Sequence, residues 1–457
     1  MIPWPLGRIA RAVDGTVHGD PDLVVDGAAY LDSRDPVAGG LYVAIVGERV
    51  DGHDFATGAH AVLGSRPTAA PTVVVDDPTV ALGRLARAVL DEVGTPVAAL
   101  TGSQGKTSTK DLLAHVLAGA GATVATAANN NNELGVPLTV LRADAGTRHL
   151  VLEMGARGVG HLAYLCEIAT PSIAAVLNVG TAHIGEFGGV EAIAAAKGEL
   201  VEALPASGTA VLNADDARVA AMASRTAARI LTFGAAGDVT WRGLELDALG
   251  RARFELGHDG AWEPVELLQT GAHQVSNAAA AAAVALAAGM DLREIAARLG
   301  TARTASRWRM ELDRRGDGLL VLNDSYNANP ASMVAALDAL RALGRERSGR
   351  LVAVLGEMRE LGEEHEAAHL EVGRAAAGVD VVLVVGDEAA ATATGAREAG
   401  VPEVILTAGR DDASAWVRKN ASADDVVLVK ASRAAALEQI AVDLLEHDPR
   451  TGGEAAR

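Results

Sequence analysis

The stretch AALTGSQGKTSTKDLLAHVL, residues 98–117, decides the fold of the middle of the chain. An apolar run ends at Leu100, glycines follow at positions 102 and 105, and a polar start to a helix comes near Lys106. Four apolar residues between 112 and 117 then recur at i, i+4 spacing, which is typical of one face of a helix. The stretch therefore predicts a buried strand, a tight glycine loop and a helix, in that order.

This loop has the features of a phosphate-binding loop, although its spacing is unusual. The common pattern is G-x-x-x-x-G-K-[ST], but the residue five places before Gly105 is Leu100. Glycines expose backbone N–H groups, the helix start adds partial positive charge, Lys106 can reach the β- and γ-phosphates, and the Thr107 hydroxyl can bind Mg²⁺. The alternative is an ordinary strand-to-helix turn with a surface lysine. The predicted nucleotide-binding residues of the loop are Gly102, Ser103, Gln104, Gly105, Lys106, Thr107 and Ser108.

Apolar runs and turn residues divide the chain into three segments. Residues 1–80 hold short β-like runs separated by turns and predict a small α/β domain. Residues 81–306 alternate strand, loop and helix, which predicts a central parallel sheet wrapped by helices around the phosphate loop. Residues 307–457 restart the alternation with four apolar runs and predict a doubly wound, Rossmann-like domain. We therefore predict a three-domain α/β protein.

Composition limits the classes of function. The chain has 457 residues, 49% hydrophobic and 22% charged, with a formal net charge of −19, so nucleic acid is not an expected partner. Cys166 is the only cysteine, which excludes an intrachain disulfide. The first residues lack a signal-peptide pattern, and the apolar stretch 278–289 is too short to span a bilayer. We expect a cytoplasmic monomer without membrane insertion.

The loop TGSQGKT resembles the shortened loop T-G-[ST]-x-G-K-[ST] of the Mur ligase family, which also includes folylpolyglutamate synthases. The stretches VLNDSYNANPASM (321–333) and GEMRELGEEHEAAH (356–369) resemble one branch of that family. The resemblance covers nearly the whole chain. It implies that ATP is used to join a carboxylate to an amine through an acyl phosphate, with two Mg²⁺ ions. For this branch the partners are UDP-N-acetylmuramoyl-tripeptide and D-alanyl-D-alanine, and residues 1–80 would bind the UDP-sugar part.

The resemblance also implies a set of metal-binding side chains. Thr107 and Glu153 would hold the first Mg²⁺, and Glu153, His183 and Lys197 the second, with Lys197 carbamylated by CO₂. Without the resemblance, a solvated strand-end glutamate, a core or surface histidine and an exposed helical lysine are the simpler interpretations. Glu153 ends an apolar run, where a carboxylate can hold Mg²⁺ beside phosphates. Lys106, Lys197, His183 and Arg307 are the predicted catalytic residues.

Two further stretches are expected beside the nucleotide. GAHQVSN (271–277) resembles the family segment next to the adenine, with Gln274 where asparagine is usual; Asn277 could instead cap the alanine helix that follows. In ASRWRME (305–311), the resemblance implies that Arg307 contacts the γ-phosphate. The nucleotide-binding residues predicted from these stretches and from 321–333 are His273, Asn277, Arg307, Asp324, Tyr326 and Asn327.

The remaining predicted residues contact the other substrates. DSRDPVAGGLYVAIVGERVDGHDF (32–55) resembles the family's UDP-sugar segment, with Tyr42 in place of phenylalanine. The polar run AANNNNELG (127–135) resembles the family segment after the loop helix, and VLVKASR (427–433) resembles K-G-S-R with alanine for glycine. The predicted substrate-binding residues are Ser33, Arg34, Asp51, Gly52, His53, Asn131, Asn132 and Arg433.

Three alternative functions stay open at this point. The first is another ligase of the family, including a folylpolyglutamate-synthase-like enzyme. The second is a phosphate-loop ATPase that does not ligate, and the third is a catalytically silent nucleotide-binding protein. The sequence does not distinguish diaminopimelate from lysine at the third position of the tripeptide.

Overall fold

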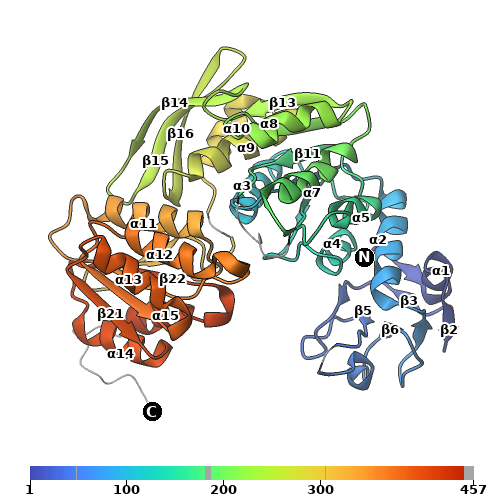
Figure 1. Ribbon diagram of the computed structural model, residues 1–457. Helices are drawn as coiled ribbons and strands as arrows, with labels where there is room; N and C mark the ends of the chain where they lie inside the picture. Colours follow the sequence, from blue (N-terminus) through green and yellow to red (C-terminus); the bar gives the residue numbers. More distant parts are fainter. Residues whose placement is uncertain (48, 181–186, 304, 447–457) are drawn as a thin grey trace.

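The computed structural model describes residues 1–47, 49–180, 187–303 and 305–446. Its strands form three large sheets, one in each third of the chain, joined in sequence order (Figure 1). The nine-stranded sheet connects the first segment, drawn in blue, to the last segment, drawn in orange and red (Figure 1). The predicted α/β class with parallel sheets is confirmed.

The first segment holds a five-stranded sheet of order β2-β7-β6-β5-β4, which is parallel except for the β2–β7 pair. A two-stranded sheet, β1-β3, lies beside α1. The elements are β1 (Trp4–Pro5), α1 (Leu6–Ala12), β2 (Thr16–His18), β3 (Val24–Val25), β4 (Ala29–Tyr30), β5 (Leu41–Val43), the 3₁₀ helix η1 (Gly52–Phe55), β6 (Ala61–Gly64) and β7 (Thr72–Val74).

The middle segment holds the sheet β16-β15-β14-β13-β12-β11-β8-β10-β9. The strands from β13 to β9 are parallel, whereas β14, β15 and β16 form an antiparallel extension. The strands are β8 (Val97–Thr101), β9 (Thr123–Ala125), β10 (His149–Glu153), β11 (Ile173–Val176), β12 (Thr209–Asn213), β13 (Arg229–Phe233), β14 (Val239–Leu246), β15 (Arg251–His258) and β16 (Ala261–Thr270). The helices are α2 (Pro78–Val93), α3 (Lys106–Leu117), α4 (Gly135–Val140), α5 (His161–Ile168), α7 (Val190–Glu202), α8 (Ala217–Ala221), η2 (Met222–Arg225), α9 (Gln274–Ala287) and α10 (Leu292–Leu299).

The last segment holds the sheet β17-β18-β22-β19-β20-β21, in which only the β17–β18 pair is antiparallel. The strands are β17 (Glu311–Arg314), β18 (Leu320–Asn323), β19 (Leu351–Leu355), β20 (Val381–Val385), β21 (Glu403–Thr407) and β22 (Val426–Lys430). The helices are α11 (Pro330–Gly344), η3 (Gly362–Glu364), α12 (His365–Ala375), η4 (Asp387–Ala389), α13 (Ala390–Glu398), α14 (Arg410–Asn420), η5 (Arg433–Ala435) and α15 (Glu438–Glu446). We propose boundaries near residues 80 and 306, because each resulting segment then contains its own sheet.

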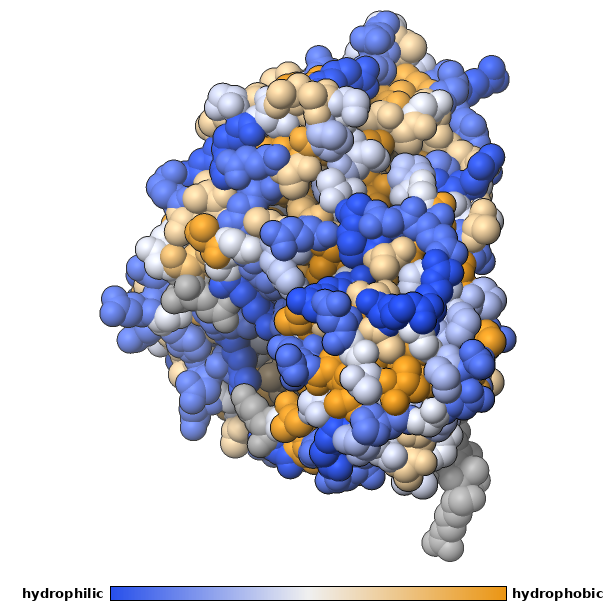
Figure 2. Space-filling view, turned by 90° about the vertical axis from the view of Figure 1, so that its right-hand side faces the viewer, coloured by the Kyte–Doolittle hydropathy of each residue, from blue (hydrophilic) through white to orange (hydrophobic). Residues whose placement is uncertain are grey.

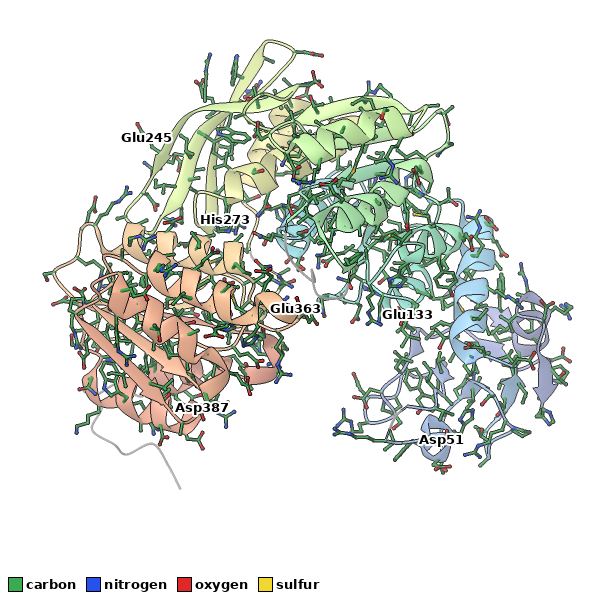
Figure 3. All side chains as sticks on the ribbon, in the orientation of Figure 1. Asp51, Glu133, Glu245, His273, Glu363 and Asp387 are labelled. Carbon is green, nitrogen blue, oxygen red and sulfur yellow. The ribbon has the colours of Figure 1, made fainter. Side chains whose placement is uncertain are left out.

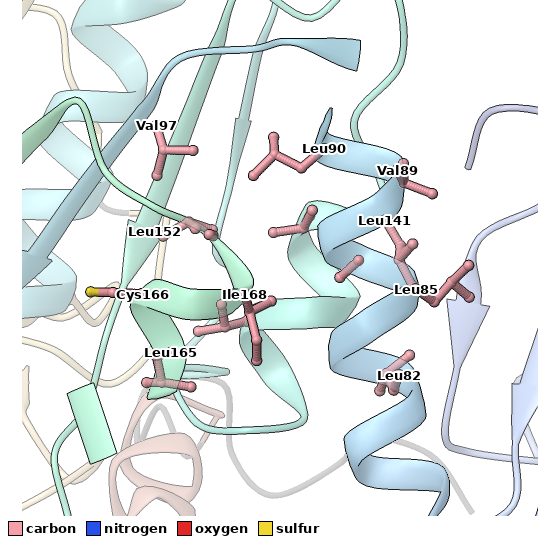
Figure 4. Close-up of a cluster of buried hydrophobic side chains, with 14 of the residues drawn as sticks. Leu82, Leu85, Val89, Leu90, Val97, Leu141, Leu152, Leu165, Cys166 and Ile168 are labelled. Atoms are coloured by element: carbon pink, nitrogen blue, oxygen red, sulfur yellow. The ribbon is translucent and has the colours of Figure 1, made fainter. Parts of the chain in front are cut away.

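Helix α2 joins the first segment to the middle one. Asp77 caps its start, accepting hydrogen bonds from the N–H groups of Thr79 and Val80, and Gly94 ends it in the left-handed conformation. Apolar side chains on α2, including Leu82, Leu85, Val89 and Leu90, pack against Leu141 and the buried face of α5 (Figure 4). The same hydrophobic cluster continues into the sheets of both segments, so α2 fixes the first segment to the middle one.

Helix α9 is buried against the opposite face of the nine-stranded sheet. Its residues from Ala278 to Ala285 are all buried, in one cluster with apolar residues of α3 and α10. Alanine side chains are small, so the backbone of α9 can approach α3 and the sheet closely. The prediction that Asn277 caps this helix is wrong, because α9 begins at Gln274 and Asn277 lies within its first turn.

The surface mixes hydrophilic and hydrophobic residues. On the face drawn in Figure 2 they are interspersed, with hydrophilic side chains prominent. Among the helices of the described residues, none combines the length and apolar character that crossing a membrane requires.

Candidate active site

A cleft of about 660 Å³ lies between the middle and last segments. On the middle side it is lined by the loop after β8, the end of β10, Lys197 of α7 and the start of α9. On the other side it is lined by the turn that precedes β17 and by the loops that follow β18, β19 and β22. The predicted residues that line it are Gly102, Ser103, Gln104, Gly105, Lys106, Thr107, Ser108, Asn131, Asn132, Glu153, Lys197, His273, Asn277, Asp324, Tyr326, Asn327 and Arg433.

The glycine loop turns as the sequence predicts. Gly105 has φ 75°, and α3 begins at Lys106. A side chain at position 105 would have its Cβ only 2.4 Å from Oδ1 of Asn277 on α9, so glycine is required there for two reasons. In this conformation Nζ of Lys106 donates to the carbonyl oxygen of Gly102 at 2.7 Å. The lysine is thus held within the loop, next to the space where phosphates would lie.

Asn178 and Gly180, which were not among the predicted site residues, hold the glycine loop. They follow β11, the strand that pairs with β8 in the sheet. The N–H of Gln104 donates to Oδ1 of Asn178 at 2.9 Å, and Nδ2 of Asn178 donates to the Gln104 carbonyl at 3.2 Å. The N–H of Gly180 donates to Oγ of Ser103 at 2.8 Å. The only sequence signal was an asparagine directly after the apolar run of β11.

Oxygen atoms from the end of β10 and from the first turn of α3 lie side by side at the predicted Mg²⁺ position. Glu153 ends β10, whose neighbour β8 leads into the glycine loop, and it is 1% exposed. Oγ1 of Thr107 donates to Oε2 of Glu153 at 2.8 Å, and Nδ2 of Asn131 donates to Oε1 at 2.8 Å. A hydroxyl and a carboxylate side by side are oxygen donors that suit Mg²⁺, so this pair fits the predicted ion.

Two lysines lie close to this pair. Burial lowers the pKa of Lys106, against the opposing effect of the Glu153 carboxylate. Burial and the positive charge of Lys106 place the pKa of Lys197 well below its usual value. Lys197 is 5% exposed, so the simpler expectation of a solvated helical lysine is wrong. His183, the other predicted metal ligand, lies outside the described residues.

On the side of the last segment, a buried ion pair organises the lining. Nζ of Lys430, at the end of β22, lies 2.5 Å from Oδ2 of Asp324 and donates to the carbonyl of Asn327 at 2.8 Å. Oδ1 of Asp324 accepts the N–H of Met310 at 3.0 Å. Asp324 therefore fixes the turn that precedes β17, and Lys430 is a site residue that the sequence analysis missed.

Arg309, and not Arg307, is the arginine of this turn that lies in the cleft. Its guanidinium stacks on the ring of Tyr326 at 4.2 Å, and its Nε has no hydrogen-bond partner among the described residues. Arg307 is exposed and outside the lining, so the γ-phosphate role predicted for it is not supported by its position. The backbone is unusual on both sides of Arg309: Trp308 and Met310 have φ of 60° and 51°, in the left-handed region that non-glycine residues rarely occupy.

The cleft collects positive charge in a chain of net charge −19. Its lining holds seven lysines and arginines but only three acidic residues. The seven are Lys106, Arg157, Lys197, Arg309, Arg359, Lys430 and Arg433. Arg433 stacks on Trp308 at 4.5 Å and pairs with Glu438 at 2.6 Å, whereas Arg157 pairs with Glu133 at 3.2 Å. Such a lining attracts ligands that carry several negative charges.

The five substrate residues predicted in the first segment lie outside this cleft. Asp51 is well separated from His273 at the start of α9 (Figure 3). It accepts the N–H of His53 at 2.9 Å and pairs with Nδ1 of the same ring at 2.5 Å, while Nε2 accepts the N–H of Ser65. Arg66 lies 3.1 Å from Asp51. Backbone and side-chain hydrogen bonds from His53, with help from Arg66, lower the pKa of Asp51 to about 2.

The other predicted residues of this segment differ in exposure. The tyrosine hydroxyl of Tyr42 donates to the carbonyl of Gly52 at 2.9 Å, so Gly52 belongs to the same fixed turn as His53. Ser33 is half-buried, and Arg34 is exposed and pairs with Asp32 at 2.7 Å. The hydrogen bond from the Arg34 side chain is the main reason that the pKa of Asp32 falls to about 2.

A phosphate loop at the carboxyl edge of one parallel sheet, facing basic residues from the corresponding edge of a second sheet, defines a nucleotide-binding enzyme that works on anionic substrates. Residues 100–285 match the family model of the Mur ligase middle domain, and residues 308–433 match that of the Mur ligase glutamate ligase domain. This chain belongs to the Mur ligase family.

Individual proteins match this chain along most of its length. A protein of Mycobacterium tuberculosis named UDP-N-acetylmuramoyl-tripeptide–D-alanyl-D-alanine ligase is 46% identical over 86% of this chain and 85% of its own. An Escherichia coli protein of the same name is 37% identical over 98% and 99% of the two chains. The crystal structure of MurF from Acinetobacter baumannii has a TM-score of 0.87 at 32% identity, covering 97% of this chain and 99% of that one. MurF from Thermotoga maritima in complex with ADP has a TM-score of 0.79 at 30% identity, covering 92% and 97%.

Proposed function

We propose that this protein is an ATP-dependent ligase that joins D-alanyl-D-alanine to the terminal carboxylate of UDP-N-acetylmuramoyl-tripeptide. The observation that carries the proposal is the shared cleft, in which the phosphate loop faces Arg309 and Lys430. The relatives named above carry this activity in their names, and one of the similar structures holds ADP. ATP is therefore the proposed nucleotide.

A carboxylate is a poor acyl donor, so the first step is its activation. One oxygen of the tripeptide's terminal carboxylate attacks the γ-phosphorus of ATP, the bond to the β–γ bridging oxygen breaks, and ADP leaves. Two anions must approach each other for this to happen. Lys106, the first turn of α3 and Arg309 are placed to reduce their repulsion, by position and charge more than by covalent chemistry.

The second step forms the amide bond. The neutral amine of D-alanyl-D-alanine attacks the carbonyl carbon of the acyl phosphate, the carbon–oxygen bond breaks, and inorganic phosphate leaves while the nitrogen loses a proton. Arg433, stacked on Trp308 at one side of the cleft, is placed to hold the carboxylate of this substrate. When bound, Mg²⁺ supplies positive charge to the phosphate oxygens, and Thr107 and Glu153 are the residues that would hold it.

We further propose that Lys197 is carbamylated and joins Glu153 and His183 in a second Mg²⁺ site. Lys197 is nearly fully buried and lines the cleft with Glu153. A carbamate would replace a buried cation beside Lys106 with an anion, which removes the like-charge contact between the two lysines. A monomeric state and a cytoplasmic location, both expected from the sequence, belong to the same proposal.

The test is phosphate release with the substrates supplied singly and together. We expect release only when ATP, the UDP-linked tripeptide and D-alanyl-D-alanine are all present, and Lys106→Ala should abolish it while leaving binding of the UDP-substrate largely intact. L-alanine, D-glutamate and a diamino acid should not replace D-alanyl-D-alanine. Release with ATP alone would instead indicate an ATPase that does not ligate, and turnover by the Lys106 variant equal to the parent's would contradict the mechanism.

A further inference from the structure

A buried ion pair lies on α3, one turn after the phosphate-loop lysine. Nζ of Lys110 is 2.7 Å from Oδ1 of Asp111, and the two side chains are 3% and 8% exposed. Consecutive residues of a helix do not normally face each other. Each member of the pair also has a partner outside the helix: Lys110 bonds the loop after β9, and Asp111 bonds Ser306 in the connection between α10 and β17.

Lys110 holds the loop on the middle side. Its Nζ donates to the carbonyl oxygens of Thr126 at 2.8 Å and Ala128 at 3.3 Å. Ala128 has φ 48°, in the region that non-glycine residues rarely occupy, so this turn needs such support. Oγ1 of Thr126 accepts the N–H of Glu153 at 3.0 Å, and the loop continues to Asn131, which donates to the Glu153 carboxylate.

Asp111 holds the connection to the last segment. Its Oδ2 accepts the N–H of Ser306 at 3.0 Å, across 195 positions of sequence. Ser306 lies three residues before Arg309, which enters the cleft between two residues with left-handed backbone. The hydrogen bond therefore fixes the start of the turn that places Arg309 in the cleft.

We propose that Lys110 and Asp111 act together as positioning residues that set the place of Arg309 relative to Glu153 and the phosphate loop. Through these two adjacent side chains, α3 is bonded both to the loop after β9, by Lys110, and to the segment before β17, by Asp111. It contacts no part of the proposed nucleotide position itself and does not line the cleft. This inference rests on the proposed function for its role in turnover, but its effect on nucleotide binding does not depend on the second substrate.

The experiment removes the hydrogen bond between Ser306 and Asp111, once from each end. Asp111→Ala removes the acceptor, and Ser306→Pro removes the donor because proline has no N–H. Asp91→Asn, which breaks the exposed Arg87–Asp91 pair of α2, is the matched control for loss of a carboxylate charge. For each variant, kcat, the KM for each substrate and the calorimetric affinity for a non-hydrolysable ATP analogue are measured, alone and combined with Arg309→Ala.

We expect Asp111→Ala and Ser306→Pro to lower kcat and weaken analogue binding, with kcat falling on the order of 10- to 100-fold, as for a misplacement of about 1 Å. The KM for the UDP-substrate and all values for the control should stay within about twofold. In the Arg309→Ala background, the same two changes should have little additional effect, because the group that they position is absent.

The decisive comparison is between the single and combined variants. Losses that multiply in the combined variants, or parent-like values for Ser306→Pro, would overturn the positioning role. If Asp111→Ala does not fold, Ser306→Pro decides alone, since it leaves the buried pair intact. A parent protein that fails to ligate would remove the proposed function, whereas the analogue affinities would still decide whether the pair positions Arg309.

Discussion

Replacing Arg309 with alanine should abolish most of the activity, and replacing Arg307 with alanine should not. The two arginines are separated by one residue, but Arg309 lines the cleft and Arg307 is exposed. The matched pair of variants removes the same charge from the same turn. Any difference between them therefore reports the position of the guanidinium and not the net charge of the protein.

The magnitude follows from the contacts of the side chain. The stacking of Arg309 on Tyr326 contributes about 0.5–1 kcal/mol to stability, so the variant should fold. A guanidinium about 4 Å from a phosphoryl charge interacts by about 4 kcal/mol at an effective dielectric constant near 20. Loss of one preorganised donor typically costs about 2.7–4 kcal/mol in the transition state, which is on the order of 10²- to 10³-fold in kcat.

The assay is ADP formation that depends on D-alanyl-D-alanine, with saturating UDP-linked tripeptide. We expect kcat of Arg309→Ala to fall on the order of 10²- to 10³-fold, partial activity for Arg309→Lys, and a value within about twofold of the parent for Arg307→Ala. A thermal melt of each variant controls for folding. If Arg309→Ala turned over at the parent's rate while Arg307→Ala lost activity, the assignment of the phosphate-contacting arginine to position 309 would be refuted.

Three further results are expected. Lys197→Ala should lose activity and regain part of it with added acetate or formate, because a small carboxylate can take the place of a carbamate; no recovery at any concentration would count against carbamylation. Treatment with EDTA should remove ligation and added Mg²⁺ should restore it, whereas full activity after chelation would contradict the role proposed for Thr107 and Glu153. Asp51→Asn should raise the KM for the UDP-substrate by about tenfold, because that is the cost of a lost charged hydrogen bond, and should leave the KM for ATP unchanged. An unchanged KM for the UDP-substrate would show that the turn held by Asp51 is structural only.

The sequence by itself determined the local elements of this protein. The run ending at Leu100 becomes β8, Gly105 takes the left-handed conformation that the loop requires, and α3 starts at Lys106. Glu153 ends β10, the parallel neighbour of β8, so it meets Thr107 at one edge of the sheet. These features are encoded within a few residues, by hydrophobic period, glycine and the direction of parallel strands.

Only the tertiary structure decided which side chains complete the cleft. Arg309, and not Arg307, lines the cleft. Its neighbours Trp308 and Met310 have left-handed backbone, and Asp324 holds the N–H of Met310, which no spacing rule predicts. Lys430 reaches Asp324 across 106 positions, and Asp111 reaches Ser306 across 195. The antiparallel extension of β14, β15 and β16 was likewise not predicted. Irregular turns take their direction from distant partners, and those contacts exist only after the three sheets have packed.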